Sequence, residues 1–468
     1  MALEFLDWIV IIIYFLIILY VGFFLARQKE SSGNATIDFL LAGRKVTLPL
    51  FVATLVATWY GNILGMGEFV YKGGIAAWTC FAFPYYIAAL LFAYFIAGKI
   101  RESNVKTIPE QIITSYGNRA GWLASFIVFL ITVPATYVFM LGILINLFTG
   151  WSLWICIITG AVCSMAYLFT GGFRADILTN SVQFILMYVG FGILTYFTLN
   201  THGSIGQMLD NLPANHKEFF GSYSWQYILS WFFIAMQTFV DPSFHQRCAA
   251  AKSPKTARRG IAVSVLFWMI FDSMTLLTGL YAKAYYITGS PVMAYPLLGD
   301  SVLPVVWKGL FIVALLATIM SSLDSFAFIS AATIGNDILK PLKKFFKKLE
   351  LFSTKALIKI GLVITAVISI ILAIIIPSAV DLIYKTSSIA IPGLLLPMLI
   401  SYNKNLSMKP SKAILIMIAA SGTSFIWTFG KIFLVHFKLF SEIEPMIPGI
   451  FISIVLALIF TKKRIANE

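Results

Sequence analysis

Residues 58–68 read TWYGNILGMGE and interrupt a stretch that is apolar on both sides. The interruption combines three glycines with two polar residues: Gly61, Gly65, Gly67, Asn62 and Glu68. Each glycine weakens a helix by up to about 1 kcal/mol relative to alanine. Gly61 and Gly65 also form a GxxxG pattern, which is typical of close helix packing, but packing does not require a carboxylate, which is costly inside a membrane. The stretch therefore predicts a membrane helix that is broken near its middle.

The composition predicts a multi-pass membrane protein. Of 468 residues, 59% are hydrophobic and only 12% are charged, whereas an average soluble domain carries about 25% charged residues. The net charge of +14 is scattered among short connections, which disfavours a nucleic-acid surface. The four histidines are dispersed without metal-ligand pairing. A membrane-embedded enzyme would need clustered acidic, basic or histidine side chains, so we expect no enzyme.

Thirteen apolar segments are long enough to cross about 30 Å of hydrocarbon. They lie near residues 7–26, 47–72, 77–98, 120–147, 152–170, 177–199, 225–243, 260–283, 302–333, 356–375, 379–402, 412–434 and 446–461. Alternate connections are rich in Lys and Arg, among them HQRCAAAKSPKTARR and LKPLKKFFKKLELFSTKALIK. By the positive-inside rule the N-terminus is outside and the C-terminus cytoplasmic.

A second interruption lies five spans after the first, where the seventh span reads WFFIAMQTFVDPSFHQR. Gln237, Asp241 and Pro242 fall within it or at its inner end, and proline removes a helical hydrogen bond. An ordinary proline kink is one explanation. Because five is odd, two five-span units would instead face opposite ways, and matched interruptions in an inverted repeat indicate a transporter's binding site.

The ninth span carries hydroxyls on one face in ALLATIMSSLDSF. Thr318, Ser321, Ser322 and Ser325 follow the spacing i, i+3, i+4 and i+7. Such hydroxyls often bond carbonyls of their own helix. The other interpretation is a cation site, in which these hydroxyls and the carbonyls freed by a broken helix give about five neutral oxygen ligands, suited to Na⁺, whereas divalent ions prefer more carboxylate.

Together these stretches resemble the sodium/solute symporter family, which includes proline, sugar, choline, pantothenate and sialic acid transporters. The likeness is carried by DFLLAGRKVTLP, TIPEQI with YGNR, TGGFRADILTNSVQ, QRCAAAKSPKTARRG and ATIMSSLDS, in that order. The resemblance implies an all-α, LeuT-type inverted-repeat fold and inward, Na⁺-driven transport by alternating access. It divides a single membrane domain, residues 1–468, into an extra helix at 7–26, repeats at 47–199 and 225–402, and accessory helices at 412–461.

The resemblance also implies a sodium site at five positions: Ala57, Tyr60, Thr318, Ser321 and Ser322. Ala57 and Tyr60 would contribute backbone carbonyls. Relatives that use a second sodium often have Thr-Asp where this sequence has Thr179 and Asn180. Candidates for a second ion site are Asp176, Asn180 and Asp324. We expect one Na⁺ per cycle, because the usual carboxylate is missing.

The solute is expected at mid-membrane between the second, third, fourth and seventh spans. The candidates are Trp59, Asn62, Glu68, Tyr85, Tyr86, Tyr137, Gln237 and Asp241. Core packing is the alternative for the aromatic residues. Read as an unpaired membrane carboxylate, Glu68 favours a zwitterion or an organic cation.

Other functions stay open at this point. Proton coupling could replace sodium coupling, and a sensor or channel derived from the same fold is a further alternative. We expect a monomer in the inner (plasma) membrane of the cell, with a small-molecule solute, Na⁺ and lipid as its partners and no nucleic acid. The sequence does not identify the solute.

Overall fold

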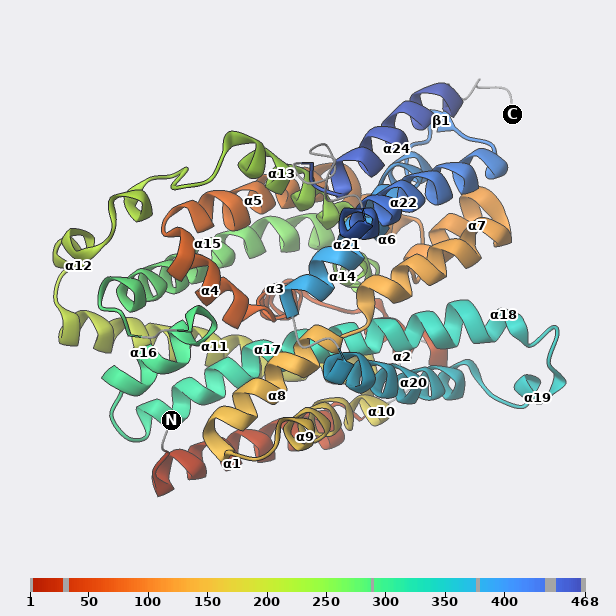
Figure 1. The fold of residues 1–468 in the computed structure, drawn as a ribbon. Helices are drawn as coiled ribbons and strands as arrows, with labels where there is room; N and C mark the ends of the chain where they lie inside the picture. The colour runs from red at the N-terminus through yellow and green to blue at the C-terminus, as the bar shows by residue number, and fades with distance from the viewer. Residues whose placement is uncertain (1–2, 28–32, 288–289, 376–378, 434–442, 464–468) are drawn as a thin grey trace.

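The chain is almost entirely helical in the computed structural model, which describes residues 3–27, 33–287, 290–375, 379–433 and 443–463. The described residues contain two short strands, β1 (Leu406–Ser407) and β2 (Lys462–Lys463), which pair antiparallel. The long helices lie side by side along one common axis (Figure 1). In lipid a backbone must satisfy its own hydrogen bonds, which helices do, and the all-α prediction is confirmed.

The helices follow one another with few long connections. In chain order they are α1 (Phe5–Tyr20), α2 (Ala35–Leu41), α3 (Leu48–Trp59), α4 (Ile63–Gly73), α5 (Phe83–Phe92), α6 (Gly98–Glu102), α7 (Ile108–Thr132), α8 (Ala135–Thr149), α9 (Leu153–Met165), α10 (Leu168–Gly171), α11 (Phe173–His202), α12 (Ile205–Asn211), α13 (Trp225–Ala235), α14 (Pro242–Ala250), α15 (Pro254–Ala284), α16 (Ala294–Val302), α17 (Trp307–Ala332), α18 (Lys340–Leu342), α19 (Lys347–Glu350), α20 (Thr354–Ile375), α21 (Ala379–Ser401), α22 (Pro410–Phe433) and α24 (Met446–Phe460). Short π-helical segments cover Val21–Leu25, Trp78–Ala82, Ala93–Ala97 and Thr333–Leu339, and 3₁₀ turns cover Ala42–Arg44, Ala214–Lys217, Met236–Phe239 and Pro291–Met293.

The predicted count of thirteen spans is not confirmed. Within the described residues, nine helices are long and apolar enough to cross a membrane, or ten if α3 and α4 count as one bent span. The segments Lys385–Ser401 and Met446–Phe460 are shorter apolar helices. The seventh predicted span is divided into α13 and α14, so neither part reaches the length of a crossing. Part of the predicted region 412–461, residues 434–442, lies outside the described residues.

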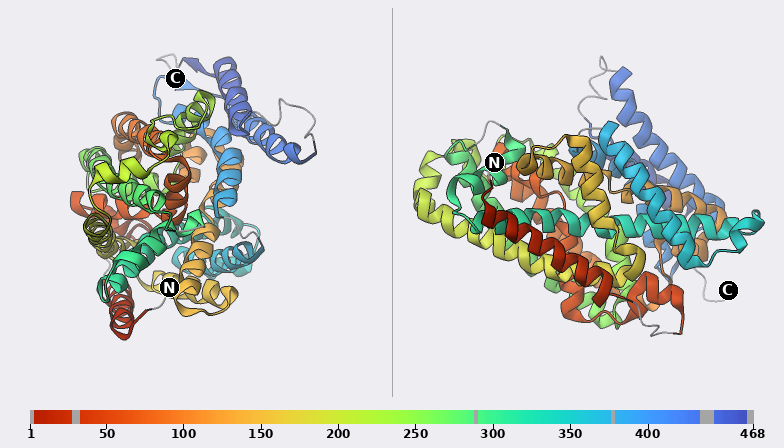
Figure 2. Two further views of the ribbon diagram at one scale, coloured as in Figure 1. Left: turned by 60° about the vertical axis from the view of Figure 1, so that its left-hand side comes forward. Right: turned by 90° about the horizontal axis from the view of Figure 1, so that it is seen from below.

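Helix α17 lies at the centre of the bundle. In its most apolar stretch 94% of the residues are buried, and the helix packs against α11, α3, α8 and α20. A helix that is hydrophobic on all sides is stable when other helices surround it. By contrast, only about a third or less of the most apolar stretch is buried in α1 and in α20. Helices α22 and α24 pack against each other at one edge of the bundle (Figure 2). The exposed apolar side chains of these outer helices suit lipid.

Both predicted interruptions are present in the structure. Helix α3 ends at Trp59 and α4 begins at Ile63, and the two are bent by 59°. Between α13 and α14 the chain passes through a 3₁₀ turn, after which Asp241 caps α14 and Pro242 occupies its first turn. The Asp241 carboxylate accepts a 2.7 Å hydrogen bond from the Ser243 amide. An aspartate followed by proline is a favourable helix start.

Gly61 allows the broken helix to approach α17. A methyl group built at this glycine would lie 2.3 Å from Cβ and Oγ of Ser322 and 2.7 Å from Cε1 of Tyr137. Atoms at that separation overlap, so one of the two helices must shift. Gly61 therefore has two roles. It leaves room for the close contact with Ser322, and its low helix propensity favours the break in the helix.

We predict that Gly61→Ala lowers the free energy of unfolding by about 1–3 kcal/mol, the usual cost of overpacking. The matched control is Gly192→Ala in α11, where a new methyl group meets nothing within 4 Å among the described residues. Thermal unfolding of both purified variants in detergent measures the difference. Equal melting temperatures for the two variants would contradict the close approach at Gly61.

Candidate functional site

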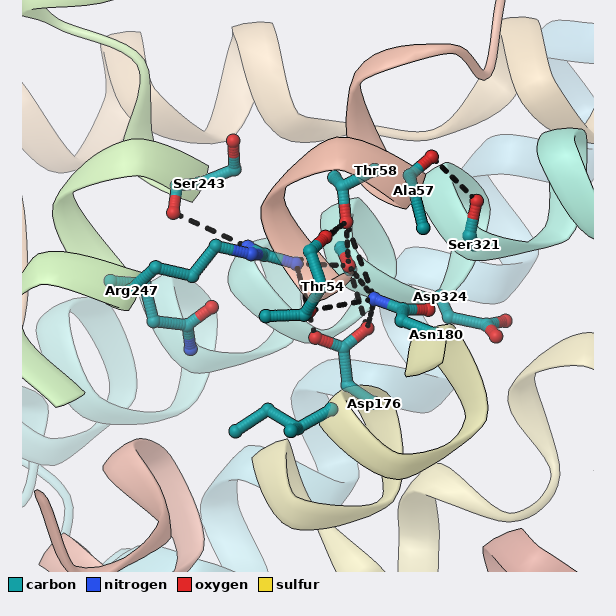
Figure 3. Close-up of polar contacts among 12 residues, drawn as sticks. Thr54, Ala57, Thr58, Asp176, Asn180, Ser243, Arg247, Ser321 and Asp324 are labelled. Carbon is teal, nitrogen blue, oxygen red and sulfur yellow. Dashed lines mark hydrogen bonds and ion pairs between the residues drawn. The ribbon is translucent and has the colours of Figure 1, made fainter. Parts of the chain in front are cut away.

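The broken helix and the hydroxyl face of α17 meet directly. Ser321 Oγ donates a 2.8 Å hydrogen bond to the Ala57 carbonyl, and Ser322 Oγ donates a 2.6 Å bond to the Thr58 carbonyl. All four residues are buried, and the contact between Ser321 and Ala57 is visible in Figure 3. These carbonyls belong to the last turn of α3, where the helix supplies no further amides. The Ser322 hydroxyl satisfies the Thr58 carbonyl, and the Ser321 hydroxyl is within reach of the Ala57 carbonyl and, at 2.9 Å, of the Thr318 carbonyl of its own helix.

The other two predicted sodium ligands lie beside this contact. Tyr60 follows α3 as its C-terminal cap, with φ −94° and ψ 18°. Thr318 Oγ1 donates to the Ala314 carbonyl of its own helix at 2.6 Å, so its hydrogen is used locally and its lone pairs remain available. The set consists of neutral oxygens, which fits a monovalent cation. The Thr58 carbonyl is a neighbour that the sequence did not single out.

A buried carboxylate positions the end of the broken helix. The Tyr60 hydroxyl donates to Asp272 Oδ1 of α15 at 2.9 Å, and the Tyr86 hydroxyl donates to Oδ2. Asp272 is 2% exposed. Tyr86, a solute candidate, thus serves to hold Asp272 in this structure. The sequence showed a carboxylate within an apolar span but not its partners, which lie 186 and 212 residues away.

The three candidates for a second ion site do not gather in one place. Asp176 and Asn180 adjoin, with Asn180 Nδ2 3.1 Å from Asp176 Oδ1. The Asp324 carboxylate instead accepts hydrogen bonds from the hydroxyls of Ser164 and Tyr167. In Figure 3, Asp324 points away from Asp176 and Asn180. Arg247, which the sequence did not predict for this site, forms a buried ion pair with Asp176, with Nη2 3.4 Å from Oδ2.

Adjoining cavities extend from the break. One of 210 Å³ is lined by Asn62, Tyr85, Gln237, Ser387, Ser388 and Glu444, among others. A larger one of 480 Å³ shares Asn62 and includes Glu68, and a third of 210 Å³ shares Gln237 and includes Tyr137. Five of the eight solute candidates therefore border these cavities. The Asn62 Oδ1 atom is buried without a hydrogen-bond partner among the described residues, which suits an atom that contacts a ligand.

The remaining solute candidates have other contacts. The Trp59 ring packs 4.9 Å from that of Tyr85 and 5.0 Å from that of Trp268, measured between ring centroids. Asp241 caps α14, and Tyr86 contacts Asp272. For these three residues the structure shows packing or structural hydrogen bonds.

The interpretation of Glu68 as an unpaired carboxylate is wrong. Its Oε1 lies 2.5 Å from Nζ of Lys72, one helical turn later, and the two side chains are 28% and 57% exposed. An exposed pair of this spacing is a common surface contact. The 210 Å³ cavity that Asn62 and Tyr85 line contains a different carboxylate, Glu444. The Glu444 Oε2 atom is buried and lacks a hydrogen-bond partner within the described part of the chain. Burial raises the pKa of the Glu444 carboxyl.

Comparison with known proteins agrees with this architecture. The model of the "Sodium:solute symporter family" matches residues 39–405. A sodium/glucose cotransporter of Vibrio parahaemolyticus is 24% identical over 384 residues, covering 72% of this chain and 69% of that protein. A high-affinity choline transporter of Drosophila melanogaster is 25% identical over 390 residues, covering 79% of this chain and 62% of that protein.

A solved structure shows the same fold. The Na⁺-coupled sialic acid symporter in its substrate-bound outward-open state superposes with a TM-score of 0.81, covering 99% of this chain and 100% of that one at 16% identity. The fold is therefore the LeuT-type inverted repeat with broken helices.

The Asp272 contacts predict unequal effects of removing two tyrosine hydroxyls. Tyr60→Phe removes a hydrogen bond to a carboxylate, which contributes about 1.5–3 kcal/mol, whereas a bond between neutral groups contributes about 0.5–1.5 kcal/mol. Tyr188→Phe is the matched control, because its hydroxyl donates to the Phe267 carbonyl at 2.6 Å. Thermal unfolding in detergent should show the larger loss for Tyr60→Phe. A larger loss for Tyr188→Phe would refute the role given to Asp272.

Proposed function

Because the chain belongs to the sodium:solute symporter family, we propose that its two interrupted helices hold one Na⁺ and one small polar organic solute and carry both into the cell. Members of this family are secondary transporters rather than enzymes, and Na⁺ is the coupling ion.

The proposed ion lies between α3 and α17. Its ligands are the carbonyls of Ala57 and Tyr60 and the hydroxyls of Thr318, Ser321 and Ser322. The observation that carries this proposal is the pair of contacts from Ser321 and Ser322 to the last carbonyls of α3. A hydroxyl that donates to a carbonyl can turn its lone pair toward a cation, which then takes the place of the hydrogen between the two oxygens. Neutral ligands favour a monovalent ion that is bound weakly enough to be released.

Coupling follows from the short distance along the chain between the two ligands. Tyr60 carries a proposed ion ligand, and Asn62, two residues later, borders two cavities. Both residues lie in the non-helical break. An ion that fixes the Tyr60 carbonyl therefore fixes the direction of the Asn62 side chain. The ion would thus increase affinity for the solute, and by reciprocity the solute would increase affinity for the ion.

The solute proposed here is a zwitterion or an organic cation. Glu444 supports this class better than Glu68 does, because Glu444 lines the cavity and its buried Oε2 atom lacks a hydrogen-bond partner in the described residues. The aromatic rings of Tyr85 and Trp231 border the same cavity, and aromatic faces attract cations. Choline, an organic cation, is named for the relative from Drosophila melanogaster.

The proposed location is the plasma membrane, with the start of the chain outside. Helix α1 begins at the end of the bundle where α12 and α16 lie, and α24 ends at the opposite end, near β1 (Figure 1). The basic segment of α18 and α19 lies at that second end, which the positive-inside rule assigns to the cytoplasm. We also propose that one copy of the chain suffices, since the proposed ion and solute sites are built within it.

The sodium proposal predicts that Ser321→Ala combined with Ser322→Ala abolishes Na⁺-stimulated uptake. Loss of two of five ligands removes most of the site, so uptake into proteoliposomes should no longer respond to an inward Na⁺ gradient. The matched control is Ser273→Ala, which removes a hydroxyl that donates to its own helix at the exposed Met269 turn. This control should keep its full sodium response. An unchanged sodium response in the double variant would disprove the assigned site, and a response to a proton gradient alone would indicate proton coupling.

The solute proposal predicts a dependence on Glu444 rather than on Glu68. A thermal-shift screen of amino acids, quaternary amines, sugars and carboxylates, with and without Na⁺, identifies the class that stabilises the protein. A positively charged compound should lose at least tenfold in affinity in Glu444→Gln and less than threefold in Glu68→Gln. The idea fails if only sugars or carboxylates stabilise the protein, or if Glu68→Gln has the larger effect.

A further inference from the structure

A basic hairpin, residues 340–353, connects the central helix to α20. It contains the short helices α18 and α19 and lies beyond the end of α20, at the edge of the molecule (Figure 1). The central helix runs into the hairpin, since the helical stretch Trp307–Leu342 is continuous. Residues 340–359 contain seven lysines and one glutamate. This end of the bundle therefore carries a concentrated positive charge.

Three lysines of the hairpin leave their charge unmatched by the protein. Lys340, Lys344 and Lys347 are exposed, and none of them forms an ion pair with another described residue. Lys343 has a different role, because its Nζ donates a 2.5 Å hydrogen bond to the Phe352 carbonyl and so closes the hairpin. The three exposed ammonium groups are therefore available to bind anions.

Large apolar side chains adjoin these lysines and are exposed as well. Phe345 is 77% exposed, Phe346 58%, Leu351 87% and Phe352 42%. The basic connection at residues 403–412, all of which the structure describes, has no large apolar side chain among the exposed residues. Exposed apolar groups gathered in this way mark a contact with a partner or a membrane. Positive charge alone does not account for the composition of the hairpin.

The height of the hairpin on the bundle matches the lipid headgroups. A methyl group built at Gly335 would lie 2.4 Å from Cα of Ile358, so the two helices touch there. The continuous apolar part of α20 follows Lys359, which places the edge of the hydrocarbon near this contact. From Gly335 to Leu342 a helix rises about 10 Å, and headgroups extend about 5–8 Å beyond the hydrocarbon. The hairpin therefore reaches through the headgroup layer.

We propose that the basic hairpin is a binding site for anionic phospholipids of the adjacent leaflet, which the proposed orientation makes the cytoplasmic one. The ammonium groups of Lys340, Lys344 and Lys347 bind the phosphates, and the rings of Phe345 and Phe346 lie at the upper ends of the acyl chains. Lysine clusters beside a membrane attract anionic lipids, and amphipathic surfaces of this kind add apolar contact to that attraction. Bound lipid holds the inner end of the helix that carries the proposed sodium ligands, although its binding does not require sodium.

The test is the Kd of purified full-length protein, in neutral detergent, for phosphatidylglycerol and for phosphatidylcholine with the same acyl chains, measured by native mass spectrometry. The native chain should bind phosphatidylglycerol at least tenfold more tightly. The combined change Lys340→Gln, Lys344→Gln and Lys347→Gln should weaken phosphatidylglycerol binding at least tenfold and leave phosphatidylcholine binding unchanged. The matched control alters three exposed lysines of other basic connections and should change the Kd less than threefold: Lys252→Gln, Lys404→Gln and Lys409→Gln.

Three results would overturn the inference. The native chain could bind both lipids equally, or the two triple variants could lose the same affinity, which would mean that net charge alone attracts the lipid. Alternatively, sn-glycerol 3-phosphate could displace phosphatidylglycerol at equal concentration, which would mean that the surface binds soluble phosphates rather than a lipid.

A second pair of variants tests the apolar part of the site and does not depend on the folding of the lysine variant. Phe345→Ser combined with Phe346→Ser should weaken phosphatidylglycerol binding at least threefold. Phe219→Ser combined with Phe220→Ser is the matched control, because these rings form an exposed pair in the connection between α12 and α13. The control should keep the native Kd. An unchanged Kd in the first variant overturns the proposed contact of the rings with lipid.

Discussion

The structure depends on two backbone carbonyls that lose their helical partners inside the membrane. Helix α3 ends at Trp59 in the interior of the bundle, where water does not compete for hydrogen bonds and an unpaired carbonyl costs several kcal/mol. Ser321 and Ser322 on α17 supply the missing donors at Ala57 and Thr58. The break therefore persists only where α17 faces it, and Gly61 is required so that α17 can come close enough. These hydrogen bonds from hydroxyls to the carbonyls can also break and form again, which a transport site requires.

Buried charge imposes the second constraint. Asp176 and Arg247 are fully buried and form an ion pair, while Asp272 receives two tyrosine hydroxyls. Removing either partner of such a pair leaves a costly charge in the interior. Both groups contact the end of α3, one through Thr58 and one through Tyr60. The non-helical residues are thus fixed on both sides, which makes the geometry of the break specific rather than loose.

The sequence predicted the fold well because its main signals are local. Hydrophobic length marks the spans, glycines with Asn62 mark the first break, and Asp241 followed by Pro242 marks the start of α14. The pairing of Glu68 with Lys72 was also readable, since the two are four residues apart. The ion pair of Asp176 and Arg247 was not, because 71 residues separate them and Arg247 lies within a basic connection. The count of thirteen spans is not confirmed, because apolar length alone does not show where a helix breaks.

These constraints also indicate which part of the site can vary between relatives. The oxygens at the end of α3 belong to the backbone, so substitution cannot remove them, and only the facing hydroxyls of α17 are adjustable. The contacts around Arg247 come from side chains throughout, namely the hydroxyls of Thr54, Thr58 and Ser325 and the carboxylate of Asp176, so substitution can remove each of them. Chains of this fold can therefore differ in the side chains that hold the end of α3 and still keep the carbonyls of Ala57 and Thr58 in the same place.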